Sequence, residues 1–150
     1  MKPPLFILTC MRSFSSVVSN MLGQHPQAYG LPELNLFVAD TLGEVIERLE
    51  THRPQGLNGL LRTIAELEYQ TQTRETVGRA RAWLAQRRQW PIRRVFDFIG
   101  QRCGARMLVE KSPSTVLDEA RLARLHRHFP EAYYLHLVRH PRATCKSIYE

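Results

Sequence analysis

The chain has 150 residues, 43% hydrophobic and 23% charged, so it is long enough for one globular domain and is not disordered. Its apolar runs are too short to cross a membrane and its N-terminus lacks a signal-peptide pattern, which together predict a cytoplasmic protein. Three widely separated cysteines predict neither a disulfide framework nor a metal site. The net charge of +7 favours an anionic ligand, whether a nucleotide, a nucleic acid or a membrane surface.

The N-terminal residues predict a strand, a loop and a helix. An apolar run at residues 5–9 predicts a buried strand, and the apolar positions after it predict a helix over residues 13–22. Gly23 would end this helix as a C-terminal cap, and a short extended segment follows at residues 28–31. The loop between strand and helix would combine free N–H groups with the positive end of a helix dipole, an arrangement that binds phosphate or sulfate.

The middle of the chain is predicted to be helical. Apolar residues recur at helical spacing within residues 38–49 and again within residues 57–67. A third, more polar helix is expected over residues 73–88. Pro91 would occupy the first position of a fourth helix, which Gly104 would close.

Strands and helices alternate again in the last third of the chain. Residues 106–109 and 132–138 predict two strands. Between them Ser114 would cap a helix that extends to about residue 129. A turn after the second strand leads into a final helix from Pro141.

Strands joined by helices indicate an α/β fold, with a parallel sheet flanked by helices and a helical insertion at about 36–102, in one domain over residues 1–150. Ligands of such sheets bind at the carboxyl ends of the strands. This rule gathers four segments into one crevice: residues 10–16, 32–33, 110–112 and 139–147.

The loop at residues 12–16 combines the guanidinium of Arg12 with serine hydroxyls and consecutive N–H groups, which suits an oxyanion. It is not a Walker A motif, because it lacks the glycine run and the Gly-Lys-Ser/Thr ending, and this disfavours a nucleoside-triphosphate kinase. An ordinary helix start capped by serines is the alternative interpretation.

Four other side chains at the predicted strand ends suit anion chemistry. Arg139 could grip a phosphate, and Ser147, eight residues later, could donate its hydroxyl to the same group. Glu33 could accept a proton from a nucleophilic hydroxyl, or it could cap the helix expected near Asn35. Lys111 could stabilise negative charge on an oxygen, with a surface ion pair as the alternative.

These segments match the motifs of a known family in order and spacing. Residues 11–16 (Met-Arg-Ser-Phe-Ser-Ser) are similar to a Pro-Arg-Ser-Gly-Thr-Thr loop, and residues 110–113 (Glu-Lys-Ser-Pro) to a Glu-Lys-Thr/Ser-Pro segment. Residues 138–147 match an arginine followed by a serine eight positions later, and Glu33 follows Arg12 by 21 residues, as a catalytic glutamate does in the tyrosylprotein branch. The chain therefore resembles the sulfotransferases that use 3′-phosphoadenosine 5′-phosphosulfate, especially the tyrosylprotein and bacterial branches.

The resemblance implies a P-loop nucleotide-binding-like sulfotransferase fold. It also implies transfer of a sulfuryl group from this nucleotide donor to a hydroxyl or amine acceptor of unknown identity, with no metal. The donor-binding residues that it implies are Arg12, Ser13, Phe14, Ser15 and Ser16 for the 5′-phosphosulfate, and Arg139 and Ser147 for the 3′-phosphate. The catalytic residues that it implies are Glu33 as base, and Lys111 with Arg12 to stabilise the bridging oxygen.

The chain departs from the family pattern in its loop and at its end. Phe14 replaces the loop glycine, which would permit close backbone approach, and Met11 replaces the proline before the arginine. Family segments that would follow Ser147 are missing. We therefore expect the N-terminal portion of a sulfotransferase domain, truncated at its C-terminus, with marginal stability or self-association through an incomplete sheet.

Three other functions compete with the sulfotransferase prediction. One is a nucleotide phosphotransferase of a related P-loop-like fold, and another is a non-catalytic or truncated nucleotide-binding fragment. A nucleic-acid binder ranks below both, because aromatic residues are not interleaved with the basic ones for base stacking, so no nucleic-acid partner is expected.

Overall fold

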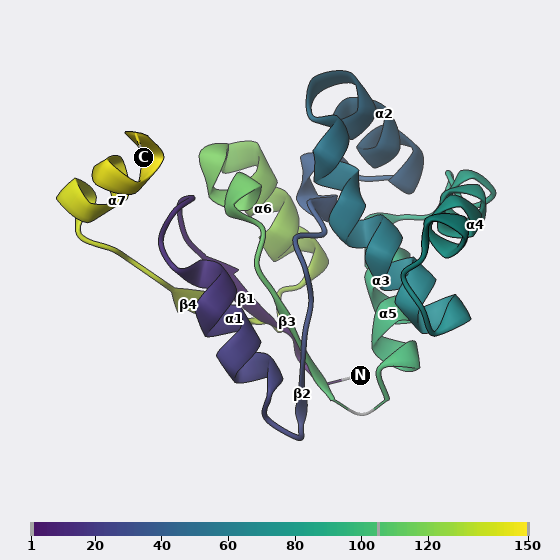
Figure 1. Ribbon diagram of the computed structural model, residues 1–150, viewed down its shortest axis with the longest axis horizontal. Helices are drawn as coiled ribbons and strands as arrows, with labels where there is room; N and C mark the ends of the chain where they lie inside the picture. Colours follow the sequence, from purple (N-terminus) through teal and green to yellow (C-terminus); the bar gives the residue numbers. More distant parts are fainter. Residues whose placement is uncertain (1, 105, 150) are drawn as a thin grey trace.

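The computed structural model describes residues 2–104 and 106–149, and it confirms the predicted α/β fold (Figure 1). Four parallel strands form one sheet in the order β2-β3-β1-β4. The strands are β1 (Leu5–Leu8), β2 (Ala28–Gly30), β3 (Met107–Glu110) and β4 (Tyr133–His136). Each lies within one or two residues of its predicted position.

The helices flank this sheet, and most of them belong to the predicted insertion. They are α1 (Ser15–Gly23), η1 (Leu36–Val38), α2 (Leu42–His52), η2 (Pro54–Leu57), α3 (Asn58–Tyr69), α4 (Arg74–Ala85), α5 (Ile92–Arg102), η3 (Pro113–Leu117), α6 (Glu119–His128) and α7 (Pro141–Tyr149). Thr41 and Thr73 begin α2 and α4 with capping boxes, in which the side chain of the cap residue accepts from the backbone N–H three residues later and the side chain at that later position accepts from the N–H of the cap residue. Figure 1 shows the insertion helices on one side of the molecule and α7 on the other.

Alternation along β1 directs side chains to both faces of the sheet. Phe6 enters the larger core, where its ring centroid lies 5.4 Å from that of Phe37 and 5.3 Å from that of Phe129. Ile7 points to the opposite face, where Val109 and the underside of α1 cover it. The long apolar insertion therefore packs on one face, while α1 covers the other face and places the loop before it, residues 9–14, at the ends of the strands.

Three predicted helix ends are wrong in detail. Ser114 does not cap a helix, because its buried hydroxyl donates to Asn35 Oδ1 at 2.6 Å, and α6 begins only after Asp118. Pro91 is itself the N-cap of α5, one position before the predicted site. Gly23 is the last residue of α1, and it is required for close approach, since a Cβ there would lie 2.9 Å from the backbone nitrogen of Gly30.

The C-terminal segment, which comprises β4 and α7, contains no buried residue among those that the structure describes. Strand β4 forms one edge of the sheet, with Tyr133 and Val138 exposed, and none of the described residues of α7 is buried. These exposed groups are compatible with the expected self-association, which stays a prediction. Among the helices in the described residues, none has the length and apolar character needed to cross a membrane.

Candidate functional site

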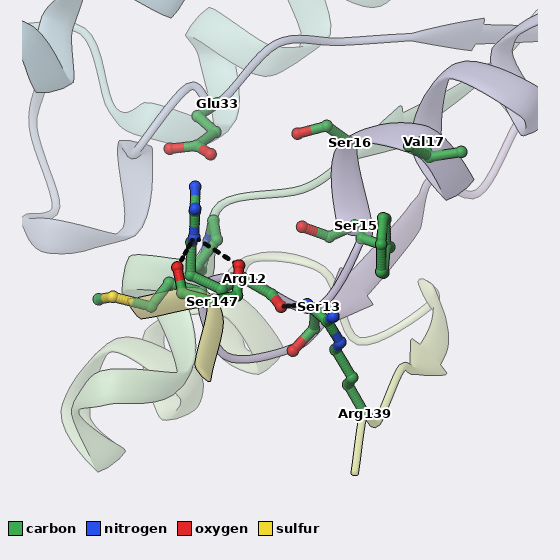
Figure 2. A pocket seen from close by; sticks show the side chains of 11 residues that line it. Arg12, Ser13, Ser15, Ser16, Val17, Glu33, Arg139 and Ser147 are labelled. Carbon is green, nitrogen blue, oxygen red and sulfur yellow. Dashed lines mark hydrogen bonds between the residues drawn. The ribbon is translucent and has the colours of Figure 1, made fainter. Parts of the chain in front are cut away.

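The strand ends enclose a hollow of about 470 Å³ at the start of α1. Its lining comprises Met11, Arg12, Ser13, Phe14, Ser15, Ser16, Val17, Glu33, Pro113, Arg139 and Ser147 (Figure 2). Every site residue predicted from the sequence lines it except Lys111, which contacts two of the lining side chains. The segments that the carboxyl-end rule predicted to share one crevice therefore do lie together in the structure.

The loop before α1 presents free N–H groups. The first bond of the helix runs from the Val18 N–H to the Phe14 carbonyl at 3.1 Å, so the preceding N–H groups lack an intrahelical acceptor. No side chain in the described part of the chain caps this end, which rules out the serine-capped alternative. Ser13 is buried and its hydroxyl lies 3.1 Å from Cys10 Sγ, whereas Ser16 faces Lys111.

Phe14 adopts a left-handed backbone conformation, which glycine tolerates best. Its φ is 58° and its ψ is 17°, in the left-handed region that costs about 1 kcal/mol or more for a residue with a Cβ. Its ring is 62% exposed, and the Arg139 guanidinium lies 4.5 Å from the ring centroid. Phe14 thus lines the hollow with an exposed side chain, and its backbone has a conformation that glycine would adopt without strain.

Lys111 contacts both Glu33, which is the predicted base, and Ser16 in the loop at residues 12–16. Its Nζ donates to Glu33 Oε1 at 2.8 Å and to Ser16 Oγ at 3.0 Å. The Lys111 side chain is only 7% exposed, so this is not a surface ion pair. Glu33 is partly exposed and does not cap η1, whose N-cap is Asn35. A buried ammonium with one carboxylate and one hydroxyl keeps both oxygen atoms at fixed positions beside the hollow.

The backbone beside Glu33 is held by a buried polar network that the sequence did not reveal. Glu110 Oε1 accepts from the Leu34 N–H at 3.2 Å and also from the Ser112 hydroxyl. Ser112 Oγ in turn accepts from the Asn35 N–H at 2.9 Å. Glu110 and Ser112 therefore fix the backbone that follows Glu33.

Burial dominates the titration of Glu110. It raises the pKa of this carboxyl from 4.5 to about 7, although the hydrogen bonds from Ser112 and Leu34 and the charge of Lys111 oppose the rise. The Glu110 carboxyl therefore keeps its proton to a higher pH than an exposed glutamate would.

Gly59 on α3 presses against the same loop from the other side. A Cβ at this position would lie 2.0 Å from the Glu33 carbonyl oxygen and 2.8 Å from its carbonyl carbon. Only glycine therefore lets the insertion helix contact the Glu33 peptide. No local signal marks Gly59 in the sequence, because the contact joins residues on different elements.

Arg12, Arg139 and Ser147 form the outer side of the hollow. Arg12 Nε donates to the Ser147 carbonyl at 2.8 Å and to its hydroxyl at 3.1 Å, and Arg139 donates to the Arg12 carbonyl at 2.7 Å. Figure 2 shows the Arg12 side chain between Ser147 and Glu33. Arg139 and Ser147 thus reach the same hollow, each connected to Arg12.

A metal centre is not evident in the described residues, where no group of three or more His, Cys, Asp or Glu side chains is placed to bind one. The site instead concentrates cations, hydroxyls and N–H groups around one carboxylate, a composition suited to an oxyanion and a proton transfer.

Two solved structures of sulfotransferase domains are similar to this chain. The sulfotransferase domain of the olefin synthase of Synechococcus PCC 7002 is 32% identical and aligns over 98% of this chain and 53% of its own, with a TM-score of 0.80. The sulfotransferase domain from the curacin biosynthetic pathway is 27% identical over 98% of this chain and 50% of its own, with a TM-score of 0.82. The chain thus spans about half the length of these two domains.

A search of curated protein sequences finds no match. The sequence model of the sulfotransferase family, however, matches residues 3–150. Because this match covers nearly the whole chain and agrees with the sheet and the loop at its strand ends, the chain belongs to the sulfotransferase family.

Proposed function

We propose that residues 1–150 are the N-terminal portion of a sulfotransferase domain that transfers a sulfuryl group from 3′-phosphoadenosine 5′-phosphosulfate to a hydroxyl or amine acceptor. The observation that carries the proposal is the position of Lys111, whose ammonium bonds both Glu33 and Ser16. One buried cation thereby joins the carboxylate suited to accept a proton to the loop suited to hold an oxyanion. Family membership supports the reaction class.

The residues of the hollow fit the anionic groups of this donor. Arg12, the serine hydroxyls and the free N–H groups of α1 suit the 5′-phosphosulfate, and Arg139 with Ser147 suits the 3′-phosphate. Glu33 is the only acidic residue among the described residues that line the hollow. A nucleotide with several negative charges would therefore meet two guanidinium groups and several hydroxyls in this hollow.

The proposed reaction assigns one role to each charged side chain. Glu33 Oε1 is occupied by Lys111, so we assign Oε2 to accept the proton of the acceptor hydroxyl. The acceptor oxygen forms its bond to sulfur as the bond between sulfur and the 5′-phosphate oxygen breaks. Lys111 and Arg12 stabilise the negative charge that this leaving oxygen acquires, an effect worth about 3 kcal/mol for one well-placed donor.

Nucleotide binding tests the donor site directly. Calorimetry with adenosine 3′,5′-bisphosphate should show binding that Arg12→Ala and Arg139→Ala each weaken about tenfold or more, because each removes a charge-assisted contact. Arg74→Ala is the matched control, since it removes the same charge from the exposed start of α4. Affinity that is equal in all four proteins would contradict the assigned site.

Turnover tests the catalytic assignment and the rival functions. Glu33→Gln should abolish sulfuryl transfer from the labelled donor to a panel of phenols and alcohols, while nucleotide affinity stays within about threefold. A fully active variant would remove Glu33 from the mechanism.

The rival functions predict other results. Magnesium-dependent ATP binding would favour a phosphotransferase, and nucleotide binding without turnover would favour a non-catalytic role. A cytoplasmic location stays a prediction.

A further inference from the structure

Glu33 borders a second hollow on the side facing the insertion. This hollow has a volume of about 290 Å³ and lies against η2 and the start of α3. The larger hollow holds the proposed donor site, and Glu33 is the lining residue that the two share. A hydroxyl bound at Glu33 would thus have the donor on one side and the second hollow on the other. This geometry rests on the proposed function of Glu33.

The second hollow is cationic. Arg53 and Arg62 line it together with the amide side chains of Gln55 and Asn58, and Glu33 is the only acid among its described lining residues. Space of this size accommodates the polar head of a small substrate. Its composition therefore favours a negatively charged group over a neutral or cationic one.

The two guanidinium groups form no salt bridge with the residues that the structure describes. Within residues 2–104 and 106–149, neither Arg53 nor Arg62 makes an ion pair, although other arginines of the insertion do, such as Arg81 with Glu50 and Arg102 with Glu68. Glu66, one helical turn after Arg62, instead accepts from the Gln72 amide at 3.2 Å. Both arginines thus remain able to bind a ligand oxyanion.

We propose that this hollow binds an anionic group of the acceptor, a carboxylate or a phosphate, while the acceptor hydroxyl lies on Glu33. The substrate class is then a hydroxyl compound that also carries an oxyanion. Arg53 and Arg62 are the specificity-determining residues, because they contact the acceptor and not the reacting atoms. Guanidinium groups suit both oxyanions, since each offers paired oxygens to a planar donor.

The test compares three phenols that differ in one group, with adenosine 3′,5′-bisphosphate already bound. The probes are 3-(4-hydroxyphenyl)propionate, its primary amide and 2-(4-hydroxyphenyl)ethyl phosphate. We expect calorimetry to show that the two anions bind about tenfold tighter than the amide, with the tighter anion identifying the preferred oxyanion. In the Arg53→Gln/Arg62→Gln double variant the preference should fall below about threefold. The exposed Arg74→Gln control should keep it.

The outcomes separate this inference from the proposed function. Equal affinity for amide and anions in the unmodified chain, with the nucleotide bound normally, would overturn the anionic pocket and leave the sulfotransferase proposal intact. A preference that survives in the double variant would overturn the assignment to Arg53 and Arg62. Failure of the nucleotide itself to bind would overturn both, because the second hollow depends on a donor in the first.

Discussion

The two sides of the candidate site are built in different ways. The inner wall, which we define as Asn35, Gly59, Glu110, Lys111 and Ser112, is buried or packed against backbone. The outer wall, which we define as Arg12, Phe14, Arg139 and Ser147, is exposed or half-buried, and its cations bond the protein's own carbonyl and hydroxyl groups. Glu33 bonds Lys111 of the inner wall and lines the larger hollow together with the residues of the outer wall.

This difference indicates that the two walls act in different ways. The inner wall is preorganised by contacts that the fold itself completes, so it fixes the proposed base and its ammonium before any ligand binds. The outer wall has guanidinium groups whose present partners a ligand oxyanion could replace. Substitutions in the inner wall should therefore change stability and geometry, whereas those in the outer wall should change ligand affinity.

The largest expected effect comes from a pair of helical glycines. Gly59→Ala should destabilise the fold by about 3 kcal/mol, because its Cβ would meet the Glu33 backbone, which cannot move aside as a flexible side chain could. Gly78→Ala is the matched control on α4, where nothing lies within 4 Å, and it should stabilise by up to about 1 kcal/mol. Urea unfolding should separate the two variants by about 4 kcal/mol. Equal stabilities would show that the Glu33 backbone can move away from the new methyl group at little cost in free energy.

The second effect is a dependence of stability on pH. In the unfolded chain Glu110 ionises near its ordinary value of 4.5, whereas burial in the folded protein raises its pKa to about 7. The folded state therefore binds more protons in this window, and the free energy of unfolding falls as the pH rises from 4.5 to 7, by about 3 kcal/mol.

Glu110→Gln isolates this contribution. Glutamine stays neutral and its amide oxygen can still accept from Leu34 and Ser112, so the variant should lose the decline in stability above pH 4.5. Urea unfolding of both proteins at pH 4.5 and pH 7.5 measures the difference. Parallel behaviour of the two proteins would mean that Glu110 does not retain its proton in the fold.

A smaller effect is expected at Phe14 in the outer wall. Phe14→Gly relieves the left-handed backbone, whereas Phe14→Ala keeps that strain, and both remove the ring beside Arg139. The glycine variant should therefore be about 1 kcal/mol more stable than the alanine variant in thermal or urea unfolding. If alanine is the more stable of the two, the loop is not strained at this residue.

The smallest expected effect on stability is that of Arg139→Ala. The side chain is half-buried and makes one hydrogen bond and one cation–π contact, so its loss should change the free energy of unfolding by only about 0.5 kcal/mol. Together with the loss of nucleotide affinity expected above, this would confirm an outer wall that serves the ligand. A loss of stability comparable to that of Gly59→Ala would abolish the distinction between the walls.

Local patterns in the sequence were sufficient for the strands, the insertion and the segments that form the site. Apolar runs marked β1 and β3, and the carboxyl-end rule then placed Arg12, Glu33 and Arg139 around one hollow. The same patterns predicted the wrong start for α6. Ser114 resembles a helix cap, but its hydroxyl donates a hydrogen bond to Asn35, which is distant in the chain.

The sequence by itself determined the order of elements and the kinds of side chain at the strand ends, since both follow from periodicity and motif spacing along the chain. Only the tertiary structure decided that Gly59 contacts Glu33, that Glu110 holds Leu34 and that Arg53 and Arg62 share a hollow with the proposed base. The physical reason is that these contacts join separate elements, and their geometry depends on how the insertion packs against the sheet, which no local pattern specifies.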